Sequence, residues 1–273
     1  MNKLTIQERA TVIRGLVEGN SIASLVRMTG IAKTTILRLI VDFGKVCEDF
    51  HDEKVRNLKS RLIQMDEVWA FIGAKDRNAT PEMKKEMQWG DAWTWTAIDP
   101  DSKLMVSWFV GPRTSDSAHD IMTDVAWRLS NRVQLTTDGL AAYWNAAINV
   151  LRNNVDYAQL IKIYGLDESH GKYSPPQCIG IEKKPRIGNP DPDLISTSYI
   201  ERSNLTVRMG IRRYTRLTNA HSKKFQNHVA MTSIFMTCYN WCRIHQTLKV
   251  TPAMAAGLTT ELFEIEDLLG FLK

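Results

Sequence analysis

The spacing of apolar and polar positions predicts a helical beginning, an alternating centre and a helical end. From Gln7 to Glu18, and again from Ser21 to Gly30, apolar residues recur at intervals of three and four, which is typical of amphipathic helices. Ser21 is a suitable N-cap and Gly30 a stop signal, and another helix begins at Lys33. Two short helices joined by a glycine-containing turn predict a helix-turn-helix unit. A plain three-helix packing module would have the same apolar pattern.

From residue 62 onward the pattern indicates strands alternating with helices. The order is three strands, helix, strand, helix, strand and further helices, which predicts an α/β fold with a mixed sheet flanked by helices. A polar insertion over 74–90 follows the first strand, and a long connection rich in Pro and Gly spans 165–195. The strands are expected at 62–72, 93–98, 104–110, 133–139 and 155–163, and the helices at 115–129 and 140–151.

Charge is distributed unevenly along the 273 residues. The net charge is only +5, from 35 Lys and Arg against 30 Asp and Glu. Residues 201–250 nevertheless hold nine basic residues and a single acid, Glu201, and residues 1–45 hold seven basic residues and three acids. Residues 46–200 have an acidic excess. Two basic blocks around an acidic middle favour a polyanionic partner; a solvated basic helix face is the alternative.

Composition excludes several classes of protein. Apolar residues make up 44% of the chain, enough for a buried core, but no run approaches 18 consecutive apolar residues, so no membrane span is expected. The N-terminal residues lack the apolar stretch of a signal peptide. Four scattered cysteines do not form a disulfide scaffold. We therefore expect a cytoplasmic protein with reduced cysteines that does not bind or span a membrane.

Three carboxylates stand where carboxylates are unusual. Asp66 interrupts an apolar strand, Asp138 ends another strand just before Gly139, and Glu201 is the one acid in the basic block. Strand ends of open α/β sheets face the ligand crevice, and an unpaired carboxylate there is costly unless it binds a cation. The alternatives are a strand-edge acid, a turn residue and a salt-bridging helix residue. Glu67, by alternation, is expected on the opposite face from Asp66 and is left out.

Three oxygen ligands from separate elements suit Mg²⁺ or Mn²⁺ better than Zn²⁺. Two such ions could activate a water or a 3′ hydroxyl and stabilise the leaving oxygen of a phosphoryl displacement. We therefore expect Asp66, Asp138 and Glu201 to be both catalytic residues and metal ligands.

Cations and hydroxyls near these elements are the candidate nucleic-acid contacts. The start of a second helix in a helix-turn-helix enters the major groove, and residues spaced three, seven and eleven after Glu201 share its helix face. The candidate DNA-binding residues are Lys33, Thr34, Thr35, Arg38, Asn204, Arg208, Arg212 and Arg213.

An ordered set of motifs resembles the DDE transposases of the insertion sequence 1 family. The resemblance covers about residues 60–260 and implies a ribonuclease H-like catalytic fold. We expect this fold to be preceded by the helix-turn-helix predicted from the apolar pattern and followed by a C-terminal helical extension. The motifs are 64–69 (QMDEVW), 134–139 (QLTTDG), 189–193 (NPDPD), 196–205 (STSYIERSNL), 213–220 (RYTRLTNA), 239–248 (YNWCRIHQTL) and 251–258 (TPAMAAGL).

The resemblance also implies an activity and partners. It implies metal-dependent cleavage and transfer of DNA strands by Asp66, Asp138 and Glu201 with two Mg²⁺ or Mn²⁺ ions. The partners are double-stranded DNA, as terminal inverted repeats and target, and further copies of the chain, at least a dimer on DNA. The location is the bacterial or archaeal cytoplasm, at the nucleoid. We expect a DNA-binding domain and linker at 1–58, a catalytic domain at 59–220 and a helical region at 221–273.

Two other functions fit the same residues. A structure-specific nuclease of the same fold would cut DNA without joining ends. A non-catalytic regulator derived from a transposase would keep only the helix-turn-helix, but it would have no need of three carboxylates and Arg208.

Overall fold

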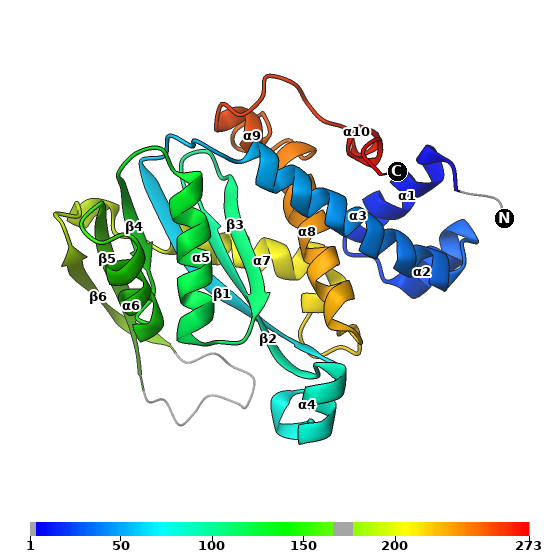
Figure 1. Ribbon diagram of the computed structural model, residues 1–273, viewed down its shortest axis with the longest axis horizontal. Helices are drawn as coiled ribbons and strands as arrows, with labels where there is room; N and C mark the ends of the chain where they lie inside the picture. The colour runs from blue at the N-terminus through cyan, green and yellow to red at the C-terminus, as the bar shows by residue number, and fades with distance from the viewer. Residues whose placement is uncertain (1–3, 166–176, 273) are drawn as a thin grey trace.

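The centre of the molecule is a single six-stranded sheet (Figure 1). In this computed structural model, which describes residues 4–165 and 177–272, the strand order is β3-β2-β1-β4-β5-β6. β1, β4 and β5 are parallel, β2 and β3 form an antiparallel meander beside β1, and β6 pairs antiparallel with β5. The bounds are β1 Leu62–Ile72, β2 Gly90–Ile98, β3 Met105–Gly111, β4 Val133–Thr137, β5 Val155–Tyr164 and β6 Cys178–Ile187. The expected mixed α/β sheet is confirmed.

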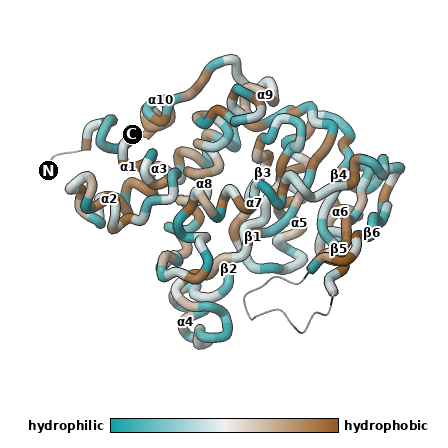
Figure 2. Tube along the Cα trace, turned by 180° about the vertical axis from the view of Figure 1, so that it is seen from behind, coloured by the Kyte–Doolittle hydropathy of each residue, from teal (hydrophilic) through white to brown (hydrophobic). Residues whose placement is uncertain are grey.

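β6 is the strand that the apolar pattern does not predict. It lies within the segment expected to be a connection, of which residues 166–176 are outside the described part of the chain. Most of its residues are exposed and its middle is polar (Figure 2). Lys183, Lys184 and Pro185 are typical of an edge strand, where an open row of backbone groups must be kept from pairing with other chains. Such a strand has no alternating apolar face.

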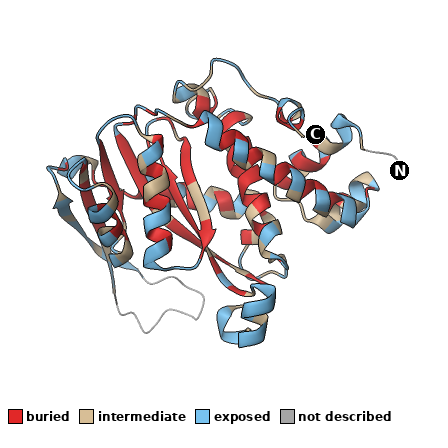
Figure 3. Cartoon of the chain, in the orientation of Figure 1, coloured by how far each residue is buried: buried red, intermediate tan, exposed pale blue. Residues whose placement is uncertain are grey.

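Helices cover both faces of the sheet (Figure 3). α5 and α6 pack against each other, and α5 also contacts β2 and β3. α7 packs on β1 and β2 from the opposite face. The sheet is consequently buried along most of its strands. The bounds are α5 Ser115–Arg128, α6 Ala141–Val150 and α7 Ser198–Gly210.

Three helices form the N-terminal part of the described chain, as the apolar spacing predicts. They are α1 Ile6–Val17, α2 Ile22–Thr29 and α3 Lys33–Lys54. The Ser21 side chain accepts a hydrogen bond from the Ser24 backbone and so caps α2. Gly30 ends α2 in the left-handed conformation, at φ +71°. α2 therefore begins and ends at the two residues that its sequence marks.

α3 joins this helical part firmly to the rest of the molecule. It is 22 residues long and packs along α8 (Phe225–Trp241). The two helices approach so closely that a Cβ on Gly44 would lie 2.5 Å from that of Ala230, so only glycine fits there. Near the C-terminal end of α3, Nε2 of the buried His51 lies 3.0 Å from the Val106 carbonyl oxygen of β3. The N-terminal helices thus share one hydrophobic core with α8 and the sheet.

The remaining elements are short. The polar insertion between β1 and β2 contains a helix that projects from the body of the molecule (Figure 1). Among the described residues, none of the helices has the length and apolar character needed to cross a membrane. The short elements are η1 Asp76–Asn78, α4 Pro81–Met87, η2 Pro192–Leu194, η3 Arg212–Tyr214, α9 Pro252–Ala255 and α10 Ile265–Leu269.

Candidate active site

The sheet brings Asp66 and Asp138 together through its parallel centre. Met65 of β1 pairs with Thr137, the last residue of β4, and a carboxylate residue follows each of them. Asp138 lies in the turn beyond β4, where its Oδ1 accepts a hydrogen bond of 2.9 Å from the Leu140 backbone. Two residues 72 positions apart in the sequence, Asp66 midway along β1 and Asp138 just past β4, therefore lie side by side.

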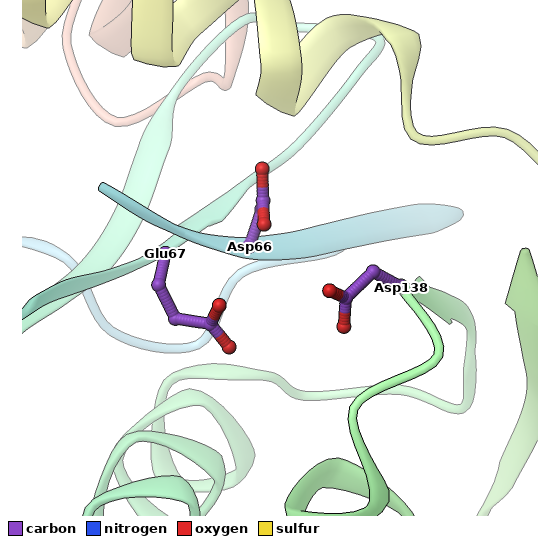
Figure 4. A group of neighbouring side chains, drawn as sticks. All are labelled: Asp66, Glu67 and Asp138. Carbon is purple, nitrogen blue, oxygen red and sulfur yellow. The ribbon is translucent and has the colours of Figure 1, made fainter. Parts of the chain in front are cut away.

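Glu67 completes this group. Asp66, Glu67 and Asp138 each offer a carboxylate oxygen, and these atoms lie within 4.8 Å of one another (Figure 4). Asp66 and Glu67 leave β1 on opposite sides, as alternation predicts. The turn that carries Asp138 nevertheless approaches from the side of Glu67, and the longer glutamate side chain reaches toward it. The expectation that Glu67 lies apart from the site is therefore wrong: alternation gives the direction of the Cβ but not the position of the carboxylate.

Asn204 of α7 holds Asp66 in place. Its side-chain amide donates a 2.8 Å hydrogen bond to Asp66 Oδ2. Thr96 of β2 donates to the Asp66 carbonyl oxygen, and its hydroxyl lies 3.3 Å from the Asn204 amide oxygen. Asn204 is only 8% exposed. Although the sequence predicts Asn204 as a DNA contact, its side chain is engaged inside the protein and orients a candidate metal ligand.

Glu201 lies one helical turn before Asn204 but outside the three-carboxylate group. Its carboxylate forms an ion pair with Lys162 of β5 and accepts a 2.6 Å hydrogen bond from the Thr197 hydroxyl. Glu201 and Lys162 are both about one-third exposed, at 39% and 32% of their side-chain surface. The negative charge of Glu201 nevertheless contributes to raising the pKa of Asp66. The role predicted for Glu201 as third metal ligand stays a prediction.

Burial and neighbouring negative charges raise the pKa values of Asp66 and Glu67. Burial, followed by the charges of Asp138 and Glu201, raises the pKa of Asp66 to about 6. Burial, followed by the charges of Asp138 and Asp66, raises the pKa of Glu67 to about 7. Both shifts mean that the ionised forms of these two carboxyls are disfavoured in the folded protein, first by burial and then by the neighbouring negative charges.

Arg113 is the cation that contacts the group. Its guanidinium Nη2 lies 3.3 Å from Glu67 Oε2 and 4.0 Å from Asp138 Oδ2. The same guanidinium lies over the ring of Trp93, 4.7 Å from its centroid. Arg113 lies just past β3 and was not singled out by the sequence, because an arginine between a proline and a threonine at a helix start has no distinctive pattern.

The donor set suits a hard divalent cation. The group consists of carboxylate oxygens alone, the ligands that Mg²⁺, Mn²⁺ and Ca²⁺ prefer. Glu67 Oε1 is buried and has no hydrogen-bond partner among the described residues, so it is available for a ligand. A cation would also supply the positive charge that the raised pKa values show to be missing. The residues therefore fit the metal expected from the sequence.

The predicted DNA contacts fall into two places. Lys33, Thr34, Thr35 and Arg38 are exposed at the start of α3. The start of α3 also faces the C-terminal basic block: a groove of about 350 Å³ lies between them. Five cations line this groove, and we call it the basic groove. They are Lys33, Arg212, Arg213, Lys223 and Lys224.

Two of the predicted arginines are partly used inside the protein. Arg208 is half-buried and its guanidinium donates a 3.3 Å hydrogen bond to the Trp69 carbonyl oxygen of β1. Arg213 donates to the Asn227 carbonyl oxygen, and burial lowers its pKa to about 10. The first contact holds the Arg208 guanidinium at the sheet, and the second holds the Arg213 guanidinium beside the basic groove. Binding of DNA by any of the eight predicted residues remains a prediction.

Comparison with known proteins gives only distant similarities. No model of a known protein family matches the sequence, and no curated protein matches it. Among solved structures, the chain is similar to the piggyBac transposase in its synaptic complex with hairpin DNA, with 10% identity, a TM-score of 0.46, and coverage of 98% of this chain and 69% of that one. It is also similar to a chain of a pre-cleavage Mos1 transpososome, with 10% identity, a TM-score of 0.28 and coverage of 87% and 78%. Both scores lie below 0.5, so function has to be argued from the residues of the site.

Proposed function

We propose that this protein is a metal-dependent DNA transposase with a ribonuclease H-like catalytic domain. The observation that carries the proposal is the meeting of Asp66, midway along β1, with Asp138, just past the C-terminal end of the neighbouring parallel strand β4, while α7, which carries Glu201, packs on β1 and β2. Open α/β sheets place their ligand site at the carboxyl ends of parallel strands. Carboxylates brought together there are typical of a site that binds divalent cations.

The residues around the site would divide the work of phosphoryl transfer. Two Mg²⁺ or Mn²⁺ ions, when bound, supply an activated water or 3′ hydroxyl and stabilise the leaving oxygen. Asp66 and Asp138 would hold these ions, and Asn204 would keep the Asp66 carboxylate oriented through its 2.8 Å hydrogen bond. Glu201 would become the third ligand on exchanging Lys162 for a cation. Arg208, held at the carbonyl of Trp69, would contact the DNA backbone.

DNA recognition is proposed for the basic regions of the chain. Helices α1 to α3 would act as a helix-turn-helix that presents the exposed residues Lys33, Thr34, Thr35 and Arg38 to the terminal inverted repeat. Arg212 would contact phosphates from the basic groove. The resemblance to the insertion sequence 1 family favours at least a dimer on DNA, target DNA as second substrate, the C-terminal helical extension, and action at the bacterial or archaeal nucleoid.

The decisive test replaces Asp138 in an assay that separates cutting from joining. A labelled duplex carrying the terminal inverted repeat is incubated with target plasmid and Mg²⁺. Wild-type protein should give nicked and strand-transfer products, and Asp138→Asn should lower both by about 1000-fold or more, since it removes a ligand of the ions that perform the chemistry. Asp120→Asn, an exposed aspartate on α5, should behave as wild type.

Other outcomes select other functions. Cleavage without a joined product would indicate a structure-specific nuclease. DNA binding with no metal-dependent product, unaffected by Asp138→Asn, would indicate a regulator without catalysis and would contradict the proposal.

A further inference from the structure

Glu67 is the most buried carboxylate of the site and the least satisfied. Its side chain is only 2% exposed, and Oε1 has no hydrogen-bond partner in the part of the chain that the structure describes. The hydroxyl of Tyr143, from α6 and also buried, lies close enough to Glu67 to lower the pKa of its carboxyl, but neither this hydroxyl nor Oε1 has a hydrogen bond of good geometry in the described chain. A buried carboxylate is costly unless it is paired and hydrogen-bonded. The described chain therefore satisfies Glu67 only in part, and Oε1 can accept a further ligand.

Arg113 satisfies Glu67 only in part. Its guanidinium lies 3.3 Å from Oε2 but is shared with Asp138, at 4.0 Å, and leaves Oε1 free. The Arg113 side chain is 39% exposed, so water screens it and it can swing away without unfolding anything. One partly exposed cation faces three carboxylates. When the three carboxyls are ionised, the group keeps a net negative charge that a further cation would neutralise.

The spacing of the carboxylates suits a divalent cation. The three oxygens lie within 4.8 Å of one another. Oxygens on opposite sides of Mg²⁺ are about 4.2 Å apart and those across Ca²⁺ about 5 Å apart, because the ligand distances are about 2.1 and 2.5 Å. A contraction of about half an ångström would bring a pair separated by 4.8 Å to the Mg²⁺ spacing. A change in a side-chain torsion angle can supply this contraction.

We propose that Glu67 is a ligand of the same divalent cation as Asp66 and Asp138, in addition to Glu201. In this arrangement Arg113 is the counter-cation of the metal-free protein, and it moves off Glu67 and Asp138 when the ion enters. The inference rests on the proposed function for the identity of Asp66 and Asp138 as metal ligands. It extends the predicted triad by one residue that sequence alternation had placed elsewhere.

The experiment measures metal affinity without DNA or catalysis. The full chain, freed of metal with EDTA and dialysed, is titrated with Mn²⁺ by calorimetry, and free Mn²⁺ is counted by electron paramagnetic resonance. Glu67→Gln keeps the size and the hydrogen-bonding capacity of the side chain, and it should weaken binding of the first ion at least tenfold. Arg113→Gln removes the competing cation and should tighten binding by several-fold. Glu86→Gln, an exposed glutamate on α4, should leave the affinity unchanged.

The outcomes separate the inference from the proposed function. Each variant is first checked for the wild-type circular dichroism spectrum and a cooperative thermal transition; Glu67→Asp, which keeps the charge, is the substitute if Glu67→Gln does not fold, and it should weaken binding less than tenfold. Wild-type Mn²⁺ affinity in folded Glu67→Gln would overturn the role of Glu67, even if strand transfer is observed. Unchanged or weaker affinity in Arg113→Gln would overturn the role of Arg113. If Mn²⁺ binds as proposed but no DNA is cut, only the transposase function fails.

Discussion

The two charged regions of this protein are built in opposite ways. In the acidic group, Asp66, Glu67 and Asp138 are crowded within 4.8 Å and Glu67 is almost completely buried. In the basic groove, Lys223 and Lys224 are both exposed. Charges that are buried and close interact strongly, whereas exposed charges are screened by water and salt. A change in the acidic group should therefore have a large and specific effect, and a change in the groove a small and additive one.

After loss of a carboxylate of the acidic group itself, the largest effect in this comparison is expected from Asn204. Replacing it with alanine removes the 2.8 Å hydrogen bond that orients Asp66, and loss of such an outer-sphere partner typically costs 10- to 100-fold in metal affinity or activity. Because Asp66 is largely buried, the free energy of unfolding in metal-free buffer should also fall by about 1–3 kcal/mol. Strand-cleavage rates and urea unfolding measure the two effects.

Asn153→Ala is the matched control, since Asn153 is exposed in the turn before β5. If Asn204→Ala cleaved DNA at the wild-type rate, Asp66 would need no such orientation, and the contrast between the two regions would weaken.

A medium effect is expected in the pH dependence of stability. The pKa values of Asp66 and Glu67 are raised to about 6 and about 7, so between pH 4.5 and 7 the folded chain keeps protons that the unfolded chain releases. Raising the pH through this window therefore lowers the free energy of unfolding, by about 2 kcal/mol or more from Glu67 alone. Burial lowers the pKa of His51 and of His228, and these two groups make the protein more stable as the pH rises. The difference in unfolding free energy between wild type and a Glu67 variant therefore isolates the contribution of Glu67.

The measurement compares wild type with Glu67→Gln by urea unfolding in EDTA across this pH range. The variant should gain stability over wild type as the pH rises, and adding Mg²⁺ should reduce that gain by stabilising the wild type. Parallel curves for the two proteins would contradict a raised pKa of the buried Glu67 carboxyl.

The smallest effects are expected in the basic groove. Each exposed lysine that contacts a phosphate contributes about 1 to the slope of log affinity against log salt. Lys223→Ala and Lys224→Ala should each weaken DNA binding by only several-fold at physiological salt, equally for all sequences, and the double variant should show the sum. Fluorescence anisotropy at several salt concentrations measures this, with Lys85→Ala on α4 as control. A salt slope that stays at the wild-type value in the double variant would exclude the groove as a DNA surface.

The strand pattern predicted much of the fold and part of the site. Apolar alternation located five strands, and the polar interruptions located Asp66 and Asp138, because a carboxylate within or just after a buried strand stands out in the sequence. β6 was missed because an exposed edge strand carries lysines and a proline instead of an apolar face. Glu67 was missed because alternation does not describe how far a side chain reaches. The engagement of Asn204 with Asp66 depends on packing between α7 and β1, which no local pattern contains.

The length of α3 has a consequence for any duplex that its first residues bind. An α-helix rises about 1.5 Å per residue, so the 22 residues of α3 span about 33 Å, close to one turn of B-form DNA. Its beginning carries Lys33, and near its end His51 is fastened to β3. The number of residues in α3 would therefore set how far from the sheet a DNA segment bound at Lys33 is held.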